Sequence, residues 1–154
     1  MKYLSLFIFA IILSCNGQKK AALGNGDDMK AGIEKLTLLL ADNYSGSEVE
    51  ETMIIKDAKA LQRFYSKINR TRKPGIPVPE VDFTKEIILI YCSGEQINGK
   101  QALLSVIAEN EKEVIISTSV EKSKKSGTST ALISPFSVYR MPLTAKEISF
   151  KGQD

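Results

Sequence analysis

Three carboxylates, Glu48, Glu50 and Glu51, come closest to an arrangement that could do acid–base chemistry. Paired carboxylates can act as general acid and base, or bind hard cations, when a cleft holds them in unequal environments. A short run of charges is more typically a solvated face of a protein. Charged side chains on a sheet edge also discourage aggregation between strands. We therefore interpret these residues as an exposed acidic edge.

A serine and nearby lysines form a second arrangement, which could support nucleophilic catalysis. The segment Ser119–Lys122 satisfies the pattern S-x-x-K, and Lys125–Gly127 resembles the K-[ST]-G of penicillin-recognising enzymes. In those enzymes the first pattern begins a helix and the second lies far away in the sequence. Here both fall within nine residues, the first at the end of an expected strand and the second in a loop. We interpret both as chance matches, because the required context is absent.

Composition excludes most other catalytic classes. The 154 residues contain no His and no Trp, and the two Cys are Cys15 and Cys92. Without His there can be no His-based triad and no His metal ligand, and two Cys cannot build a zinc ribbon or a disulfide scaffold. Cys92 lies in the most apolar segment, where a lone thiol is typically a small buried hydrophobe. We predict that the protein is not an enzyme and has no catalytic residue, metal site or cofactor.

Two basic clusters, Arg70–Lys73 and Lys122–Lys125, raise the question of a polyanionic partner. The chain carries 21 Lys and Arg against 18 Asp and Glu, a net charge of +3, which is too small to imply one. Neither cluster is interleaved with the aromatic residues that stack on single-stranded nucleic acid. We expect solvated loops and predict no nucleic-acid partner, with contact to anionic lipid or to an acidic partner as the alternative.

The first 14 residues are predicted to be a lipoprotein signal peptide. One positive charge precedes the apolar run Leu4–Leu13. That run is too short for a spanning helix, which needs about 20 apolar residues. The segment Ile12–Cys15 resembles a bacterial lipobox, which implies cleavage after Ser14 and attachment of a diacylglycerol to the Cys15 thiol. An ordinary cleavage site would carry a small residue at the position of Ile12.

The lipidated Cys15 is expected to hold the protein to a membrane, because two or three acyl chains anchor a protein stably whereas one chain does so marginally. The next residue is Asn16 rather than Asp, which favours the outer membrane by analogy with lipoprotein sorting in two-membrane bacteria. We expect the protein to face the periplasm. Residues 15–30 contain several Gly and few apolar residues, which indicates a flexible tether. Residues 31–154 are then expected to form one domain.

The spacing of apolar residues predicts one helix with Asp57 as its N-cap. Its apolar residues recur every three or four positions, at Ala58, Leu61, Phe64, Tyr65 and Ile68. The helix must end before Lys73, because Pro74 follows.

Strands are predicted on both sides of this helix, at residues 50–55, 87–92, 101–108, 114–120, 136–141 and 147–150. Residues 33–40 are apolar enough for either a strand or a helix. The run Ile87–Cys92 shows no alternation, so we expect a central strand that is covered on both faces. Residues 101–108 and 114–120 are expected to form a hairpin. The predicted fold class is α+β, a mainly antiparallel β-sheet or sandwich with one amphipathic helix.

Several short motifs occur in a recognisable order. In Val81–Ile90 the residues V-D-F lead into an apolar strand, which ends at Gly94, and Pro135–Phe136 forms a Pro-aromatic step before a terminal strand. These motifs resemble the C-terminal domain of PrcB-like proteins, bacterial lipoproteins named for a subunit of a protease complex. The resemblance covers about residues 50–150. The family's turn often reads G-G-Y, whereas this chain has Asn-Gly-Lys-Gln at 98–101. We expect Asp82 to cap a turn and the rings of Phe83 and Phe136 to lie in the core.

The resemblance implies a non-catalytic accessory domain that binds or stabilises another exported protein, for instance a protease. The alternative is a module that binds a small ligand or a cell-envelope polymer. An apolar concavity with a few convergent polar groups would favour the alternative, and a flat or convex face would favour protein contacts.

Overall fold

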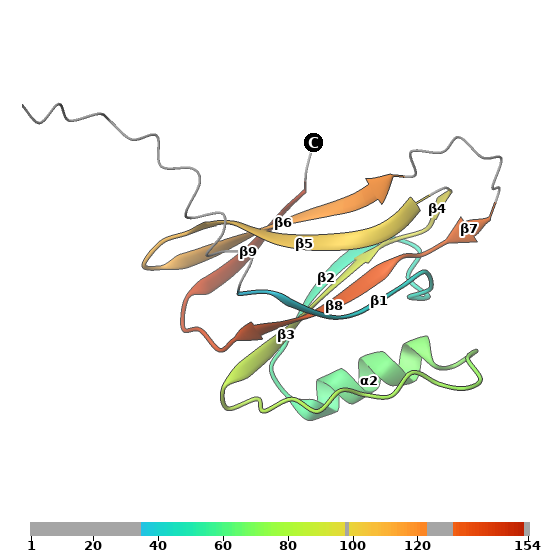
Figure 1. Cartoon of the computed structure of the whole chain (residues 1–154), viewed down its shortest axis with the longest axis horizontal. Coiled ribbons are helices and arrows are strands. Elements are labelled where there is room, and N and C mark those ends of the chain that lie inside the picture. The colour runs from blue at the N-terminus through green and yellow to red at the C-terminus, as the bar shows by residue number, and fades with distance from the viewer. Residues whose placement is uncertain (1–34, 98, 123–130, 153–154) are drawn as a thin grey trace, which may run out of the picture.

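The structure, a computed structural model, describes residues 35–97, 99–122 and 131–152. The elements follow in the order β1 (Thr37–Asp42), β2 (Glu50–Ile55), α2 (Ala58–Ile68), β3 (Glu86–Ser93), β4 (Gln96–Ile97), β5 (Gly99–Glu109), β6 (Glu113–Lys122), β7 (Leu132–Ile133), β8 (Phe136–Pro142) and β9 (Glu147–Gly152). The larger sheets have four and three strands. Figure 1 shows α2 below the four-stranded sheet, which we call the middle sheet, and the three-stranded upper sheet above it. The signal peptide, Cys15 and the tether, predicted for residues 1–30, lie outside the described residues.

The middle sheet has the strand order β1-β8-β3-β2, and all its neighbouring strands are antiparallel. Its strand β3 lies between β8 and β2. Leu89 belongs to the cluster facing the upper sheet, Ile90 belongs to the cluster facing α2, and both side chains are fully buried. A strand that is covered on both faces needs apolar residues at every position. The predicted central strand is therefore confirmed.

The upper sheet has the strand order β5-β6-β9. β5 and β6 form the predicted antiparallel hairpin, and the Asn110 side chain closes its turn by accepting the N–H groups of Lys112 and Glu113 at 2.8 Å each. β9 differs from the expected antiparallel pattern, because it pairs with β6 in parallel. The chain passes through β8 in the middle sheet before it reaches β9, and such a crossover permits a parallel neighbour where a tight turn would not.

The predicted helix is confirmed as α2, and its N-cap is Asp57. One Asp57 carboxylate oxygen accepts the Ala60 N–H at 2.8 Å. The buried face presents Leu61, Phe64, Tyr65 and Ile68 to the middle sheet. The first residue of the expected apolar face, Ala58, is exposed instead, because it lies in the first turn at the end of the helix.

The turn between the helix and β3 follows the sequence expectation. The Asp82 carboxylate accepts the Thr84 N–H at 3.1 Å, and the Asp82 carbonyl accepts the Glu86 N–H at 2.9 Å. Phe83 packs against the cluster beneath the middle sheet, and Phe136 is fully buried in that cluster. The predicted cap and the core position of Phe136 are confirmed, whereas Phe83 is only partly buried at the border of the core.

The described chain is thus mostly antiparallel β-sheet with one short amphipathic helix, as the sequence predicts. The ambiguous segment 33–40 enters strand β1 at Thr37. The two-residue strands β4 and β7 were not expected, since they are too short to show a periodicity. Within residues 35–97, 99–122 and 131–152, no helix has the length and hydropathy that crossing a membrane requires.

Candidate functional site

Three segments that are distant in the sequence meet at one end of the molecule. We call this region the loop end, and it consists of residues 43–49 after β1, residues 94–97 after β3, and residues 131–134 around β7. The ribbon β4–β7 joins the last two segments, with Ile97 paired to Leu132. In Figure 1 this ribbon lies at the far end of the sheets from the β5–β6 turn.

Backbone hydrogen bonds hold the loop end together. The Ser45 N–H donates to the Ser134 carbonyl at 2.8 Å, and the Ser134 N–H donates to the Asn43 carbonyl at 2.9 Å. The Glu95 N–H donates to the Glu48 carbonyl at 3.1 Å. Because these bonds cross-link all three segments, the loop end has a defined backbone shape without being a regular sheet.

Two buried serines add side-chain hydrogen bonds to this framework. The Ser134 hydroxyl lies 3.1 Å from the Ser45 N–H and 3.3 Å from the Gly46 N–H, and it accepts from both. The Ser45 hydroxyl accepts the Ser47 N–H at 3.1 Å. Ser45 and Ser47 are both buried, so an apolar replacement of Ser45 would leave the Ser47 N–H without this acceptor.

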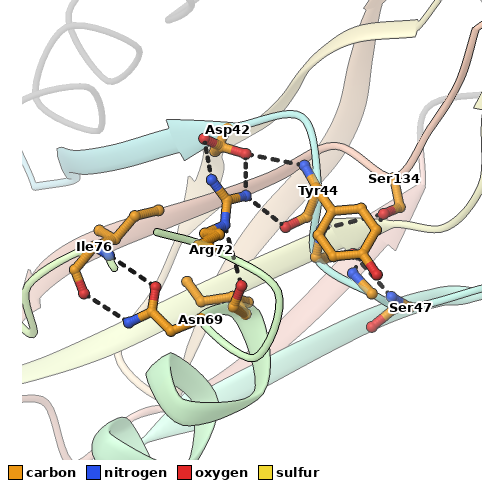
Figure 2. Close-up of polar contacts among 10 residues, drawn as sticks. Asp42, Tyr44, Ser47, Asn69, Arg72, Ile76 and Ser134 are labelled. Atoms are coloured by element: carbon orange, nitrogen blue, oxygen red, sulfur yellow. Dashed lines mark hydrogen bonds and ion pairs between the residues drawn. The ribbon is translucent and has the colours of Figure 1, made fainter. Parts of the chain in front are cut away.

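Arg72, in the loop after α2, fastens the loop end from the side, as Figure 2 shows. Its Nη1 donates to the Asp42 carboxylate at 3.0 Å, and its Nη2 donates to the second oxygen of the same carboxylate and to the Tyr44 carbonyl at 2.9 Å. Its Nε donates to the Ile68 carbonyl at 3.1 Å. Arg72 therefore joins the end of the helix to the end of β1, and it is not the freely solvated cation that its basic cluster indicated.

Asn69, the C-cap of α2, fixes the loop that carries Arg72. Its side-chain amide donates to the Ile76 carbonyl and accepts the Ile76 N–H, both at 2.8 Å (Figure 2). This paired contact closes residues 69–76 into a compact loop, which sets the direction from which Arg72 reaches Asp42.

The Asp42 carboxylate is held in its charged form. Burial raises the pKa of Asp42, but the hydrogen bonds from Arg72 and from the Tyr44 N–H together lower it by more than burial raises it. The pKa therefore lies below its ordinary value of 3.8. The same ion pair raises the pKa of Arg72. The contact therefore persists as an ion pair at any pH near neutrality.

Gly94 permits the close approach of two loop-end segments. Its φ is +72°, a conformation that residues with a Cβ rarely adopt. A Cβ built at Gly94 would lie 2.8 Å from the Val49 carbonyl carbon and 2.9 Å from the Glu50 nitrogen. Only glycine fits both the backbone angle and the space, which explains why a glycine follows the last residue of β3.

Four large apolar side chains project from this fastened backbone. Their exposed fractions are 48% for Tyr44, 73% for Val49, 64% for Ile97 and 59% for Leu132. Ile97 and Leu132 are directly opposite in the antiparallel ribbon, so their side chains lie together on one face. Tyr44 is bridged to Ser134, two residues beyond Leu132. Isolated exposed apolar residues are ordinary, but the presence of four at one end of the domain, two of them paired, makes this end a candidate contact surface.

The structure does not bring the carboxylates of Glu48, Glu50 and Glu51 together in one cleft. The Glu51 carboxylate faces α2, where it lies 3.3 Å from the Ser47 hydroxyl and 4.0 Å from the Lys67 ammonium. The Glu50 carboxylate faces the upper sheet and lies 3.4 Å from the Thr118 hydroxyl. Glu48 is exposed in the loop before β2. Glu50 and Glu51 lie on opposite faces of an outer strand, which agrees with the interpretation as an acidic edge.

Two open grooves border β2, one on each face. A groove of about 280 Å³ lies against α2 and is lined by Glu51, Met53, Ile55, Ala60, Arg63, Phe64 and Lys67. A groove of about 370 Å³ lies against the upper sheet and is lined by Glu50, Glu51, Thr52, Thr118, Phe150 and Gly152. In the part of the chain that the structure describes, no three acidic or cysteine side chains gather closely enough to hold a metal ion.

Cys92 is fully buried in β3, as predicted. Burial raises the pKa of its thiol to about 11, so the thiol is protonated and unreactive near neutral pH.

The serine of the S-x-x-K pattern, Ser119, lies on β6 opposite Leu103, and Lys122 is the last residue of that strand. Strand geometry differs from the helix start that the chemistry requires. Lys125–Gly127, with most of the second basic cluster, lies outside the described residues.

No sequence pattern identifies the four apolar residues of the loop end as a surface. The available signal was weak: Tyr44 stands in an Asn-Tyr-Ser-Gly turn and Ile97 precedes an Asn-Gly pair, so each is an apolar residue among turn formers. The pairing of Ile97 with Leu132 and the bridge from Tyr44 to Ser134 join segments that are far apart in the chain, which no local pattern reports.

Comparisons with known protein families, with curated proteins and with solved structures find no match to this chain. The resemblance of residues 50–150 to PrcB-like proteins remains a prediction.

Proposed function

We propose that this protein is a lipid-anchored component of the bacterial cell envelope, held by acyl chains on Cys15 at the outer membrane and facing the periplasm. In this proposal it is a non-catalytic accessory domain with an α+β sandwich fold, and it binds or stabilises another exported protein. The observation that supports protein binding is the loop end, where Tyr44, Val49, Ile97 and Leu132 are exposed on a backbone that hydrogen bonds hold together. The membrane anchor is proposed from the lipobox resemblance of Ile12–Cys15.

The rigidity of the loop end supports protein binding. Ordering loops on association costs free energy, and a surface that is already ordered avoids much of that cost. The serine network and the Arg72–Asp42 ion pair supply this order before any partner is present. Aromatic and aliphatic side chains on such a platform are the usual anchors of a protein interface.

The second candidate function is binding of a small ligand or a cell-envelope polymer. The groove of about 370 Å³ beside β2 favours it, because ligand sites commonly measure about 300–1,000 Å³. Its lining includes Glu50 and Thr118, which offer polar contacts, and one aromatic ring, Phe150.

The loop end is tested by capture of the tagged full chain after detergent extraction. We expect Ile97→Glu and Leu132→Glu each to lose an exported protein that the wild-type chain retains, since a charge at the centre of an apolar contact must be desolvated. Leu143→Glu is the matched control: Leu143 is similarly exposed at 48% but follows β8 at the opposite end of the sheet. Retention of the same partner by all three variants would exclude the loop end as the binding surface.

The anchoring part of the proposal is tested by Cys15→Ser. Removal of the thiol prevents lipid attachment, so we expect the protein to leave the membrane fraction. Cys92→Ser is the control that keeps the lipidation site. Unchanged membrane fractionation of Cys15→Ser would rule out lipid anchoring at this residue.

A further inference from the structure

The outer strand of the middle sheet, β2, has a regular and open edge. β2 pairs with β3 over all six of its residues without a shift in register. The opposite outer strand, β1, has a shift between Leu38 and Leu40, and such irregularities blunt an edge against further pairing. No backbone hydrogen bond from the described residues reaches the outer edge of β2. Alternate residues of β2 therefore turn their N–H and C=O groups outward.

The charges along this edge are opposite at its two ends. Glu50 and Glu51 begin the strand, Lys56 follows it, and all three are exposed. We consider a second copy placed antiparallel beside the first, with a two-fold axis at Met53. Glu50 of each copy then lies opposite Lys56 of the other, on the same face of the joined sheet, since directly opposite residues share a face. A shift of two residues removes this Glu50–Lys56 pairing.

The outer strand of the upper sheet, β9, runs alongside β2. Glu50 and Thr52 of β2 line the same groove as Phe150 and Gly152 of β9. Thr118 connects the two edges, because its hydroxyl lies 3.4 Å from Glu50 Oε1 and 3.4 Å from the Lys151 backbone carbonyl oxygen.

β9 has the same order of charges as β2. It begins with Glu147 and has Lys151 near its end, and among the described strands it pairs only with β6. A two-fold axis at Ser149 places Glu147 opposite Lys151 of a second copy. Two neighbouring edges on one side of the molecule are therefore each complementary to themselves in the antiparallel direction.

We infer that two copies of this chain associate through this side, with β2 pairing antiparallel to β2 and β9 lying against β9 about one two-fold axis. The occupant is a second copy because the charge order of both edges is self-complementary, as a two-fold interface requires. A parallel, in-register stack would bring Glu50 and Glu51 against their own copies, so the same charges favour a closed dimer over a fibre. This inference concerns a surface other than the loop end and does not depend on the proposed function.

The test uses two full chains with different C-terminal tags, each behind a flexible linker, co-expressed and extracted in detergent. Capture by one tag measures recovery of the other. We expect strong recovery for wild type with wild type. Glu50→Lys with itself, and Lys56→Glu with itself, should lose about tenfold or more, because two opposite-charge contacts become two like-charge contacts. When Glu50→Lys is co-expressed with Lys56→Glu, each contact again joins a Lys and a Glu, and recovery should return.

Matched controls change the same charges elsewhere. Glu95→Lys and Lys59→Glu are at exposed positions outside β2 and should leave recovery unchanged. Restoration in the mixed pair shows that both variants fold. The inference is overturned by unchanged recovery in every combination, by failure of the mixed pair to recover, or by no recovery for the wild-type pair. The last outcome would indicate that the edge is free or takes an extended segment of another protein.

Discussion

Arg72 and Asp42 are 30 residues apart in the sequence, and they form a two-armed ion pair that fastens the end of α2 to the end of β1. Both side chains are largely shielded, with exposed fractions of 20% and 29%. The planar guanidinium spans both carboxylate oxygens and still reaches the Tyr44 carbonyl. A lysine ammonium is a single point charge and cannot make this fork.

We expect Arg72→Lys to lower the free energy of unfolding by about 1 to 2 kcal/mol, because it keeps the charge but loses most of the forked contacts. Arg70→Lys is the control, since Arg70 is exposed and surface changes typically stay within about 0.5 kcal/mol. Urea unfolding followed by circular dichroism measures both. Equal stability of Arg72→Lys and wild type would show that the ion pair is not stabilising.

The pH dependence of stability should carry the signature of Asp42. Because the pKa of Asp42 is lowered in the folded state, its ion pair stabilises the fold above the ordinary value of 3.8 and loses this effect as the pH falls through the folded pKa. The stability difference between wild type and Asp42→Asn should therefore be largest near pH 7 and shrink below about pH 4. Urea titrations at pH 7, 5, 4 and 3 measure it. A difference that stays constant with pH would contradict the assignment.

Gly94→Ala should destabilise the protein by roughly 2 to 4 kcal/mol, because the added Cβ meets the Val49 backbone at 2.8 Å and the residue must keep a positive φ. Gly152→Ala is a sharp control, since a Cβ at Gly152 meets nothing within 4 Å. Thermal unfolding of both variants provides the comparison. Similar melting temperatures for the two would mean that the loop end moves to accommodate the methyl group at low cost.

Removal of the helix cap should have a moderate effect. Asp57→Ala leaves the Ala60 N–H without its side-chain acceptor, so we expect a loss of about 1 kcal/mol in the free energy of unfolding. Asp57→Ser should recover most of it, because a hydroxyl can accept the same hydrogen bond. Chemical denaturation of the two variants tests this, and equal losses would exclude capping as the cause.

Thiol labelling should report the burial of Cys92. In a Cys15→Ser chain it is the only thiol, it is fully buried, and burial raises its pKa to about 11. We expect negligible reaction with a thiol reagent at pH 8 in the native state and complete reaction in denaturant, because the thiolate is the reactive species. Rapid labelling of the native protein would indicate that β3 opens readily.

Sequence alone was sufficient for the features that depend on local periodicity. The spacing of Leu61, Phe64, Tyr65 and Ile68 predicts α2 and its buried face. A helix has 3.6 residues per turn, so these positions share one face independently of the rest of the fold. The unbroken apolar run of β3 predicts a strand covered on both sides. The proposal that Cys15 carries a lipid depends on the sequence alone, because that residue lies outside the described structure.

Tertiary structure decided what depends on contacts between distant segments. The sequence around Arg72 and around Asp42 does not mark the two residues as partners. The sequence of β9 likewise does not determine that it pairs in parallel with β6. Likewise, Ile97 and Leu132 become a surface only because β4 and β7 pair. A side-chain pattern reports which face of one element is apolar, whereas the pairing of elements is set by chain topology and by the loops that close it. The sequence therefore specified the elements, and the fold assembled the loop end and aligned the two open edges.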